Sequence, residues 1–130
     1  MKKAVVLLLS MVCLMSCNAF MDTDGKLAGK WQLRSVESDL VSIPVDTVYY
    51  NFQNALFMYQ VRLPNGEMPL SYGYKTVVGD DELLLELLDK SFVDTYTNWG
   101  DTAKVFTIKK LDSKQLVLES EKIIYNFRKF

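Results

Sequence analysis

The sequence predicts an all-β domain of eight antiparallel strands, closed into a barrel or stacked as a sandwich. The chain has 130 residues, of which 49% are hydrophobic, and this is enough for one domain with its own core. Apolar and polar residues alternate through most of residues 27–130, which is the period of a strand with one buried face. No long helical pattern separates the alternating runs, so parallel strands joined by helices are excluded.

The expected strands cover residues 30–37, 46–53, 55–63, 68–78, 82–88, 103–110, 115–120 and 122–129. Val48, Tyr50 and Phe52 illustrate the alternation that defines them. Short turns join most of the strands. The clearest is Pro64-Asn65-Gly66-Glu67, because an Asn-Gly pair accepts the positive φ angles of a tight hairpin. A barrel of such strands has no exposed edge, and eight strands enclose either packed side chains or one small ligand.

Residues 90–100 are the least regular part of this region. Phe92, Tyr96 and Trp99 follow one another at intervals of four and three residues, which places them on one face of a helix. We therefore expect one short helix or long loop near residues 90–100. Its aromatic face is expected to form a lid over one mouth of the barrel or to seal that mouth.

The first residues carry a targeting signal. Lys2 and Lys3 precede an apolar run of 12 residues, 4–15, which is short of the roughly 20 residues that a membrane-spanning helix needs. The run ends in Leu14-Met15-Ser16-Cys17, which resembles the lipobox of bacterial lipoproteins. The resemblance implies cleavage before Cys17, acylation of this cysteine and anchoring in the cell envelope, with the outer membrane as the expected location. The alternative is an ordinary secretory signal in which Cys17 stands by chance.

Composition excludes several classes of function. The chain has no histidine, which rules out mechanisms and zinc sites built on imidazole, and Cys13 and Cys17 are too few for a four-cysteine metal site. A net charge of −1 gives no basic surface for nucleic acid. The acidic run Asp80-Asp81-Glu82 lacks the spacing of a calcium loop and is interpreted as a solvated turn. We expect no catalytic residue, metal or cofactor, and a protein that is not an enzyme.

A family resemblance begins at Leu27-Ala28-Gly29-Lys30-Trp31-Gln32-Leu33. A Gly-x-Trp motif that opens the first of eight antiparallel strands is similar to the lipocalin superfamily, and the whole arrangement resembles small lipocalin-like lipoproteins of Gram-negative envelopes. The resemblance implies an up-and-down barrel over residues 27–130, after a signal peptide at 1–16 and a lipidated tether at 17–26. It also implies that Trp31 plugs one end of the barrel beneath a cation, with Arg128 as the first candidate and Lys129 as the second.

Aromatic residues that recur along the chain are the candidates for a ligand site. Tyrosine combines apolar area with one hydrogen-bonding group, which suits a pocket or a lid. The residues assigned to this role are Tyr50, Tyr59, Tyr72, Tyr74, Tyr96 and Trp99. The alternative is that they are ordinary core and rim residues of a β protein.

Two functions follow from these features. In the first, a membrane-anchored lipoprotein binds a small apolar or amphipathic ligand inside its barrel. In the second, the barrel is filled and serves as a module that docks another protein of the cell envelope. Interior space lined by apolar and tyrosine side chains favours the first function, whereas a packed interior with a large exposed apolar patch favours the second.

Overall fold

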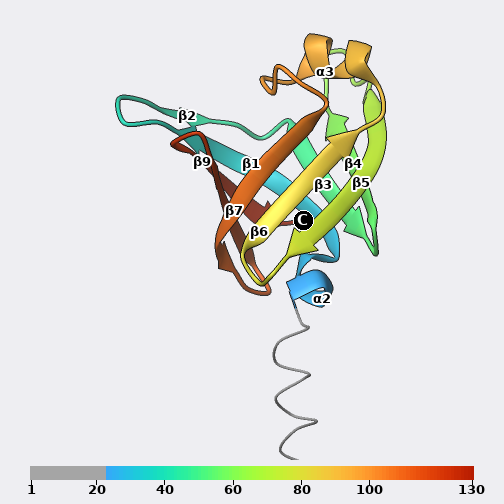
Figure 1. The fold of residues 1–130 in the computed structure, drawn as a ribbon. Coiled ribbons are helices and arrows are strands. Elements are labelled where there is room, and N and C mark those ends of the chain that lie inside the picture. Colours follow the sequence, from blue (N-terminus) through green and yellow to red (C-terminus); the bar gives the residue numbers. More distant parts are fainter. Residues whose placement is uncertain (1–22) are drawn as a thin grey trace, which may run out of the picture.

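Eight antiparallel strands close into a barrel in the computed structural model, which describes residues 23–130 (Figure 1). In chain order the elements are α2 (Thr23–Leu27), β1 (Gly29–Glu37), β2 (Ser42–Pro44), β3 (Val48–Gln53), β4 (Leu56–Val61), β5 (Leu70–Val78), β6 (Glu82–Leu87), α3 (Lys90–Tyr96), β7 (Ala103–Leu111), β8 (Gln115–Ser120) and β9 (Ile123–Lys129). The predicted signal peptide and Cys17 lie outside the described residues.

The barrel is built in sequence order. The ring consists of β1 and β3 to β9, and each of these strands pairs with the next one of the ring along the chain. The ring closes where β1 pairs with β9. At this closure Trp31 lies opposite Lys129, and Leu33 lies opposite Phe127. The eight predicted strands are all present with small shifts at their ends, so the predicted up-and-down barrel is confirmed.

Three segments differ from the expectation. β2 is absent from the predicted strands because it has only three residues, all of them exposed; it pairs with the end of β1 outside the ring. Residues 23–26, predicted as part of the tether, belong to α2, which ends at the fully buried Leu27. The irregular segment contains α3, and Trp99 lies beyond its end rather than on its face.

Two turns show how the local sequence sets the hairpins. In the turn between β3 and β4, Asn54 has a φ of 55°, a conformation that asparagine adopts more readily than most residues. In the predicted turn at residues 64–67, Gly66 has a φ of 88° and its N–H donates to the carbonyl oxygen of Leu63 at 3.0 Å. Both turns fold the chain back on itself, and the hairpin predicted at residues 64–67 is confirmed.

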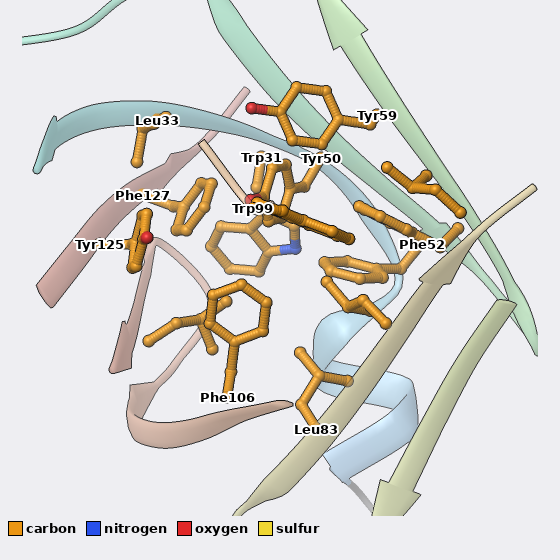
Figure 2. Packing of buried hydrophobic residues seen from close by; sticks show 14 of the residues in the cluster. Trp31, Leu33, Tyr50, Phe52, Tyr59, Leu83, Trp99, Phe106, Tyr125 and Phe127 are labelled. Carbon is orange, nitrogen blue, oxygen red and sulfur yellow. The ribbon is translucent and has the colours of Figure 1, made fainter. Parts of the chain in front are cut away.

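Alternate residues of each barrel strand point into a single core (Figure 2). Along β4, for example, Phe57, Tyr59 and Val61 are buried while Leu56 is exposed. The short helices lie at opposite ends of the barrel, α2 at one end and α3 at the other (Figure 1). Among residues 23–130, no helix has the length and hydropathy needed to cross a bilayer.

Candidate functional site

Trp31 closes the end of the barrel that carries α2. Its side chain is fully buried, and its Nε1 donates a 2.8 Å hydrogen bond to the carbonyl oxygen of Leu27. The cation above the ring is Lys129, whose Nζ lies 4.6 Å from the ring centroid. Arg128, the first candidate for this role, is exposed and lines an open groove of about 640 Å³ on the outside of the barrel. The assignment of the cation is therefore corrected from Arg128 to Lys129.

Strand alternation explains this correction. Lys129 is the partner of Trp31 across the β1–β9 ladder, and residues directly opposite each other project from the same face of a sheet. Arg128 is the partner of Gln32, one position away, and so it projects to the outside. The Lys129 ammonium also donates to the carbonyl oxygen of Ala28, which ties the start of β1 to the end of β9.

Three of the six aromatic candidates lie inside the barrel. The exposed fractions of Tyr50, Tyr59 and Trp99 are 1%, 5% and 7%. Tyr96 is half-buried at the end of α3, where its ring centroid lies 5.0 Å from that of Phe92. These four residues belong to the interior or to the cover of the barrel.

Tyr72 and Tyr74 lie on the outside. They are 59% and 47% exposed on the outer face of β5, and this corrects their assignment to a pocket. The inward positions of β5 are Ser71, Gly73 and Lys75, all of them buried. The strand thus directs its small and charged residues inward and its aromatic residues outward, which is the reverse of what hydrophobicity alone predicts.

The indole of Trp99 lies at the centre of the aromatic interior (Figure 2). It stacks on Phe57 at an interplanar angle of 5°, with 6.1 Å between ring centroids. Tyr50, Tyr59 and Phe106 meet it at steep angles, with centroid distances of 6.4, 5.7 and 6.0 Å. Its Nε1 is buried, and its contact with the Tyr50 hydroxyl falls outside regular hydrogen-bond geometry. The middle of the barrel is thus filled by a side chain from the loop between α3 and β7.

Burial governs the chemistry of the inner hydroxyl groups. It raises the pKa of Tyr50 well above its ordinary value; a charge on Tyr59 would raise it further, and the nearby Trp99 indole partly offsets the effect. Burial also raises the pKa of Tyr59 and that of Tyr125, where the hydrogen bond from Asn98 partly offsets the effect. All three hydroxyls are therefore neutral near pH 7, so they can orient a polar group through hydrogen bonds but do not supply a negative charge.

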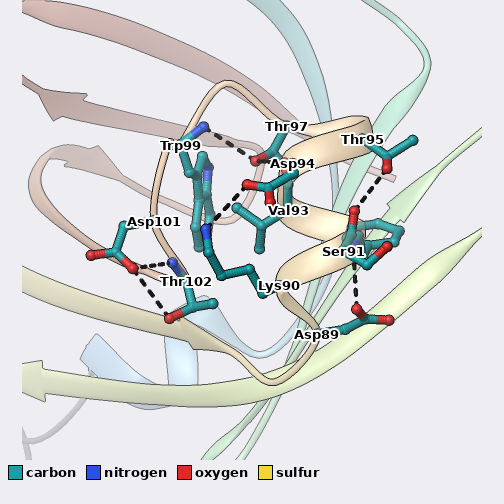
Figure 3. A network of polar contacts seen from close by, with 11 residues as sticks. Asp89, Lys90, Ser91, Val93, Asp94, Thr95, Thr97, Trp99, Asp101 and Thr102 are labelled. Carbon is teal, nitrogen blue, oxygen red and sulfur yellow. Dashed lines mark hydrogen bonds and ion pairs between the residues drawn. The ribbon is translucent and has the colours of Figure 1, made fainter.

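The loop that carries Trp99 is tied to α3 (Figure 3). Asp89 caps the helix, because its Oδ1 accepts a 3.1 Å hydrogen bond from the N–H of Phe92. At the other end, the Thr97 hydroxyl donates to the carbonyl oxygen of Val93 at 2.8 Å and accepts from the N–H of Trp99 at 3.1 Å. These bonds make α3 and the start of the loop one local unit.

Apolar contacts hold this unit on the barrel. Phe92, Val93 and Trp99 are buried in the core cluster. A polar link to a strand is the 3.4 Å hydrogen bond from Nδ2 of Asn98 to the hydroxyl of Tyr125 on β9. The cover at this end of the barrel thus lacks the continuous backbone ladder that joins the strands.

Two lysines project from the inner face of the barrel, and the sequence analysis singled out neither. Lys75 is 5% exposed, and its Nζ lies 2.9 Å from Oδ1 of Asp24 on α2. Lys104, on β7, is 9% exposed; its Nζ lies 5.9 Å from the ring centroid of Phe106 and has no carboxylate within 4.0 Å among residues 23–130. The alternation in the predicted strand 103–110 could have placed Lys104 on the inner face, because it lies two residues before the inward Phe106.

An apolar surface lies on the outside of the barrel, over β4, β5 and the end of β6. Its members are large hydrophobic residues that are at least 38% exposed: Leu56, Leu70, Tyr72, Tyr74 and Leu88. We call this set the outer apolar patch. Leu56 and Tyr74 are direct partners across the β4–β5 ladder, and the N–H of Leu88 donates to the carbonyl oxygen of Tyr72, so the patch is continuous.

The chemistry of the barrel suits noncovalent binding. Within the described part of the chain, no three His, Cys, Asp or Glu side chains are grouped to hold a metal ion. The interior instead combines aromatic surface with neutral hydroxyl groups. Aromatic side chains with a few polar groups are the usual lining of small-molecule sites, and here they pack against one another.

Known proteins with similar sequences and structures share this architecture. A family model described as a lipocalin-like domain matches residues 11–130. A lipocalin-like protein from Bacteroides uniformis is 35% identical; the match covers 81% of this chain and 99% of that one, with a TM-score of 0.75. An uncharacterized protein from Bacteroides eggerthii is 29% identical, with 80% of this chain and 99% of that one covered and a TM-score of 0.71. No curated protein matches the chain.

Proposed function

Because the chain belongs to the lipocalin-like domain family, we propose that it is a lipoprotein of the bacterial cell envelope whose barrel binds a small apolar or amphipathic molecule. The observation that carries the proposal is the lining of the barrel. Tyr50 and Tyr59 bring aromatic area and hydroxyl groups together inside the barrel, around the Trp99 indole that fills its middle. Aromatic surface with few polar groups is the usual lining of a small-molecule site.

Anchoring through Cys17 would set the orientation of the barrel. Cys17 precedes the start of α2 at Thr23 by six positions, and α2 lies at the end of the barrel opposite α3. A lipid on Cys17 would hold the α2 end near the membrane and turn the α3 end away from it. The expected location is the outer membrane, and a ligand would enter from the α3 side.

Lipid attachment is tested by Cys17→Ala. We expect the variant to lose labelling by radioactive palmitate and to leave the membrane fraction, because two or three acyl chains hold a protein stably on a bilayer. Cys13→Ala is the matched control and should keep its label. Persistent labelling of the Cys17→Ala protein would contradict the lipoprotein assignment.

Ligand binding is tested by native mass spectrometry of the full-length protein purified from membranes. We expect a small molecule to remain bound after detergent is removed in the gas phase and to dissociate on collisional activation. As a second measurement, the uncharged fluorescent probe N-phenyl-1-naphthylamine should bind the protein with saturation. Absence of both a bound molecule and saturable probe binding would refute the proposal.

A second candidate function is docking to another envelope protein, and the filled interior together with the outer apolar patch favours it. Exposed apolar surface of this kind often marks a protein interface. A photo-crosslinking residue placed at Tyr72 should capture a defined partner in cells, whereas one placed at the outward-facing Lys109 on β7 should not. Equal capture at both positions would count against docking through the patch.

A further inference from the structure

A row of cations crosses the outside of the barrel from β1 over β9 and β8 to β7. Arg128 on β9 lies directly opposite Gln32 on β1 and Gln115 on β8, so these three side chains project from the same outer face. At one end of the row, Nη1 of Arg34 donates to Oε1 of Gln32 at 3.2 Å. At the other end, Nζ of Lys110 donates to Oε1 of Gln115 at 2.6 Å. The three cations thus follow one another with an amide between each pair.

A β-bulge in β1 sets the position of Arg34. The β1–β9 register shifts between Leu33 and Ser35, so Arg34 is the extra residue and has no partner on β9. Such a bulge increases the twist of its strand and redirects a side chain. Regular pairing resumes at Ser35, whose Oγ accepts a 3.0 Å hydrogen bond from Nδ2 of Asn126. The irregular position of this ladder is therefore occupied by a cation of the row.

No carboxylate neutralises these cations among residues 23–130. Lys114, in the turn between β7 and β8, adds a fourth cation, and we call the set Arg34, Lys110, Lys114 and Arg128 the cationic row. The ion pairs of the described chain use other basic residues, and no carboxylate oxygen lies within 4.0 Å of these four. Neighbouring like charges repel, and amides at the positions between them do not cancel the charge. The row therefore concentrates positive charge on a chain whose net charge is −1.

The cationic row borders the open groove of about 640 Å³ on the outside of the barrel. Arg34, Lys114 and Arg128 line this groove. Its one carboxylate belongs to Asp112, whose Oδ1 accepts hydrogen bonds from the backbone N–H groups of Lys114 at 2.8 Å and Gln115 at 2.7 Å. Three cations exceed one carboxylate, so the groove suits an anion with several acceptor oxygens. Phosphate is the anion that arginine and lysine bind in this way.

The groove lies toward the α2 end of the barrel. Arg128 is next to Lys129, which covers Trp31 at that end. The β7–β8 turn at residues 112–114 also lies there, because it lines a hollow together with residues of α2. Cys17 precedes the start of α2 by six positions, which span at most about 22 Å. A membrane that holds a lipid on Cys17 is therefore within reach of the cationic row.

From these observations we propose that the cationic row docks one side of the barrel on phosphate-bearing anionic lipids of the membrane in which the chain is anchored. Headgroup phosphates accept hydrogen bonds from Arg34, Lys114 and Arg128 in the groove, and Lys110 adds to the attraction. This inference rests on the proposed lipid anchor, and it adds a second membrane contact with its own lipid chemistry. Since β5 lies across the ring from β9, the outer apolar patch then faces away from the bilayer.

The orientation is measured with spin labels on the full-length protein in nanodiscs. One label is attached through Val117→Cys on the outer face of β8, and the matched one through Thr76→Cys on the outer face of β5. Each site lies two residues from the end of its strand that is nearer α2. The nanodiscs contain phosphatidylcholine with or without phosphatidylglycerol, and a gadolinium chelate on a lipid headgroup enhances the relaxation of nearby labels.

Anionic lipid should bring Val117 closer to the bilayer than Thr76. We expect phosphatidylglycerol to raise the ratio of the two relaxation rates by at least about twofold, because each basic residue near an anionic surface favours docking by about fivefold. Added salt should reverse the rise by screening. Equal relaxation of the two labels in both kinds of nanodisc overturns this inference while the lipid anchor stands.

The role of the row is tested by combining Arg34→Gln with Arg128→Gln. We expect this double variant to return the ratio to its value in phosphatidylcholine alone. Arg62→Gln combined with Lys90→Gln is the matched control, because it removes the same charge from residues that are paired with Asp46 and Asp94. A control variant that lowers the ratio as much as the first variant does overturns the assignment of the row.

Two further readouts separate the remaining explanations. Glycerol 3-phosphate, added to phosphatidylcholine nanodiscs, tests whether the groove takes a soluble phosphate: saturable binding seen by the Val117 label, without a response to phosphatidylglycerol, overturns membrane docking. The chain without an introduced cysteine should take no spin label, because Cys17 is acylated and Cys13 is removed with the signal peptide. Labelling of that chain overturns both the proposed anchor and this inference.

Discussion

Truncation of Trp31 is the most direct test of how the barrel is held closed. The residue is fully buried, its Nε1 donates to the carbonyl oxygen of Leu27 at 2.8 Å, and the Lys129 ammonium lies 4.6 Å from its ring centroid. It thus joins three parts of the chain: the end of α2, the first strand and the last strand. Trp31→Ala removes all of these contacts at once.

The expected loss can be worked out from these contacts. Truncation of a buried tryptophan to alanine costs about 3–5 kcal/mol, against a total stability of about 5–15 kcal/mol for a domain. Trp31→Phe keeps most of the ring and loses the hydrogen bond to Leu27, which should cost about 1–3 kcal/mol because a buried carbonyl oxygen is left without its donor. Lys129→Met loses the cation above the ring and the bond to Ala28, for about 1–2 kcal/mol.

The measurement is urea unfolding of the purified protein, followed by far-UV circular dichroism because the substitution removes one of the two fluorescent indoles. Arg128→Met is the matched control: it removes a cation from the same strand but from the outer face, and it should change stability by less than about 0.5 kcal/mol. A loss below about 1 kcal/mol for Trp31→Ala, or a larger loss for Arg128→Met than for Lys129→Met, would refute the reasoning.

Three further predictions follow from buried groups elsewhere in the barrel. Asp24→Asn should destabilise the protein by about 1–3 kcal/mol in urea unfolding and by more than Lys75→Met, because only the first change leaves a buried ammonium without its partner. Burial raises the pKa of Tyr59 in the folded state, so the unfolded chain releases this proton first as the pH rises above 10. Stability should then fall by about 1.4 kcal/mol per pH unit for this residue, and Tyr59→Phe should reduce the slope by that amount in unfolding curves taken at increasing pH. Gly73→Ala would place a Cβ 1.8 Å from the carbonyl oxygen of Glu86, so thermal unfolding should report a loss of about 1–3 kcal/mol as β5 and β6 move apart.

The order of the strands and turns could be predicted from the sequence, because each of these elements depends on residues that are close together in the chain. Alternation along the chain marks a strand with one buried face, as in β4, and it needs no knowledge of the partner strand. The turn at Asn65-Gly66 is equally local, since it depends on which residues tolerate a positive φ. β2 escaped prediction because three exposed residues carry no alternating pattern.

The faces of the strands were harder to assign. Tyr72 and Tyr74 have the apolar character of core residues, yet β5 directs Ser71, Gly73 and Lys75 inward. Gly73 is required there by the close approach of the β6 backbone, and Lys75 by its partner Asp24 on α2. Both reasons involve segments distant in sequence, so hydrophobicity within the strand pointed to the wrong face.

The sequence by itself determined the strands, their antiparallel order and the position of Trp31 on the first of them, because these depend on local patterns and on a short motif. Only the tertiary structure decided that Lys129 rather than Arg128 covers that ring, and that the loop residue Trp99 fills the barrel. The physical reason is ring closure. Pairing of β1 with β9 places Trp31 opposite Lys129, whose ammonium also bonds to Ala28, 101 positions away along the chain, and it sets which side chains meet inside.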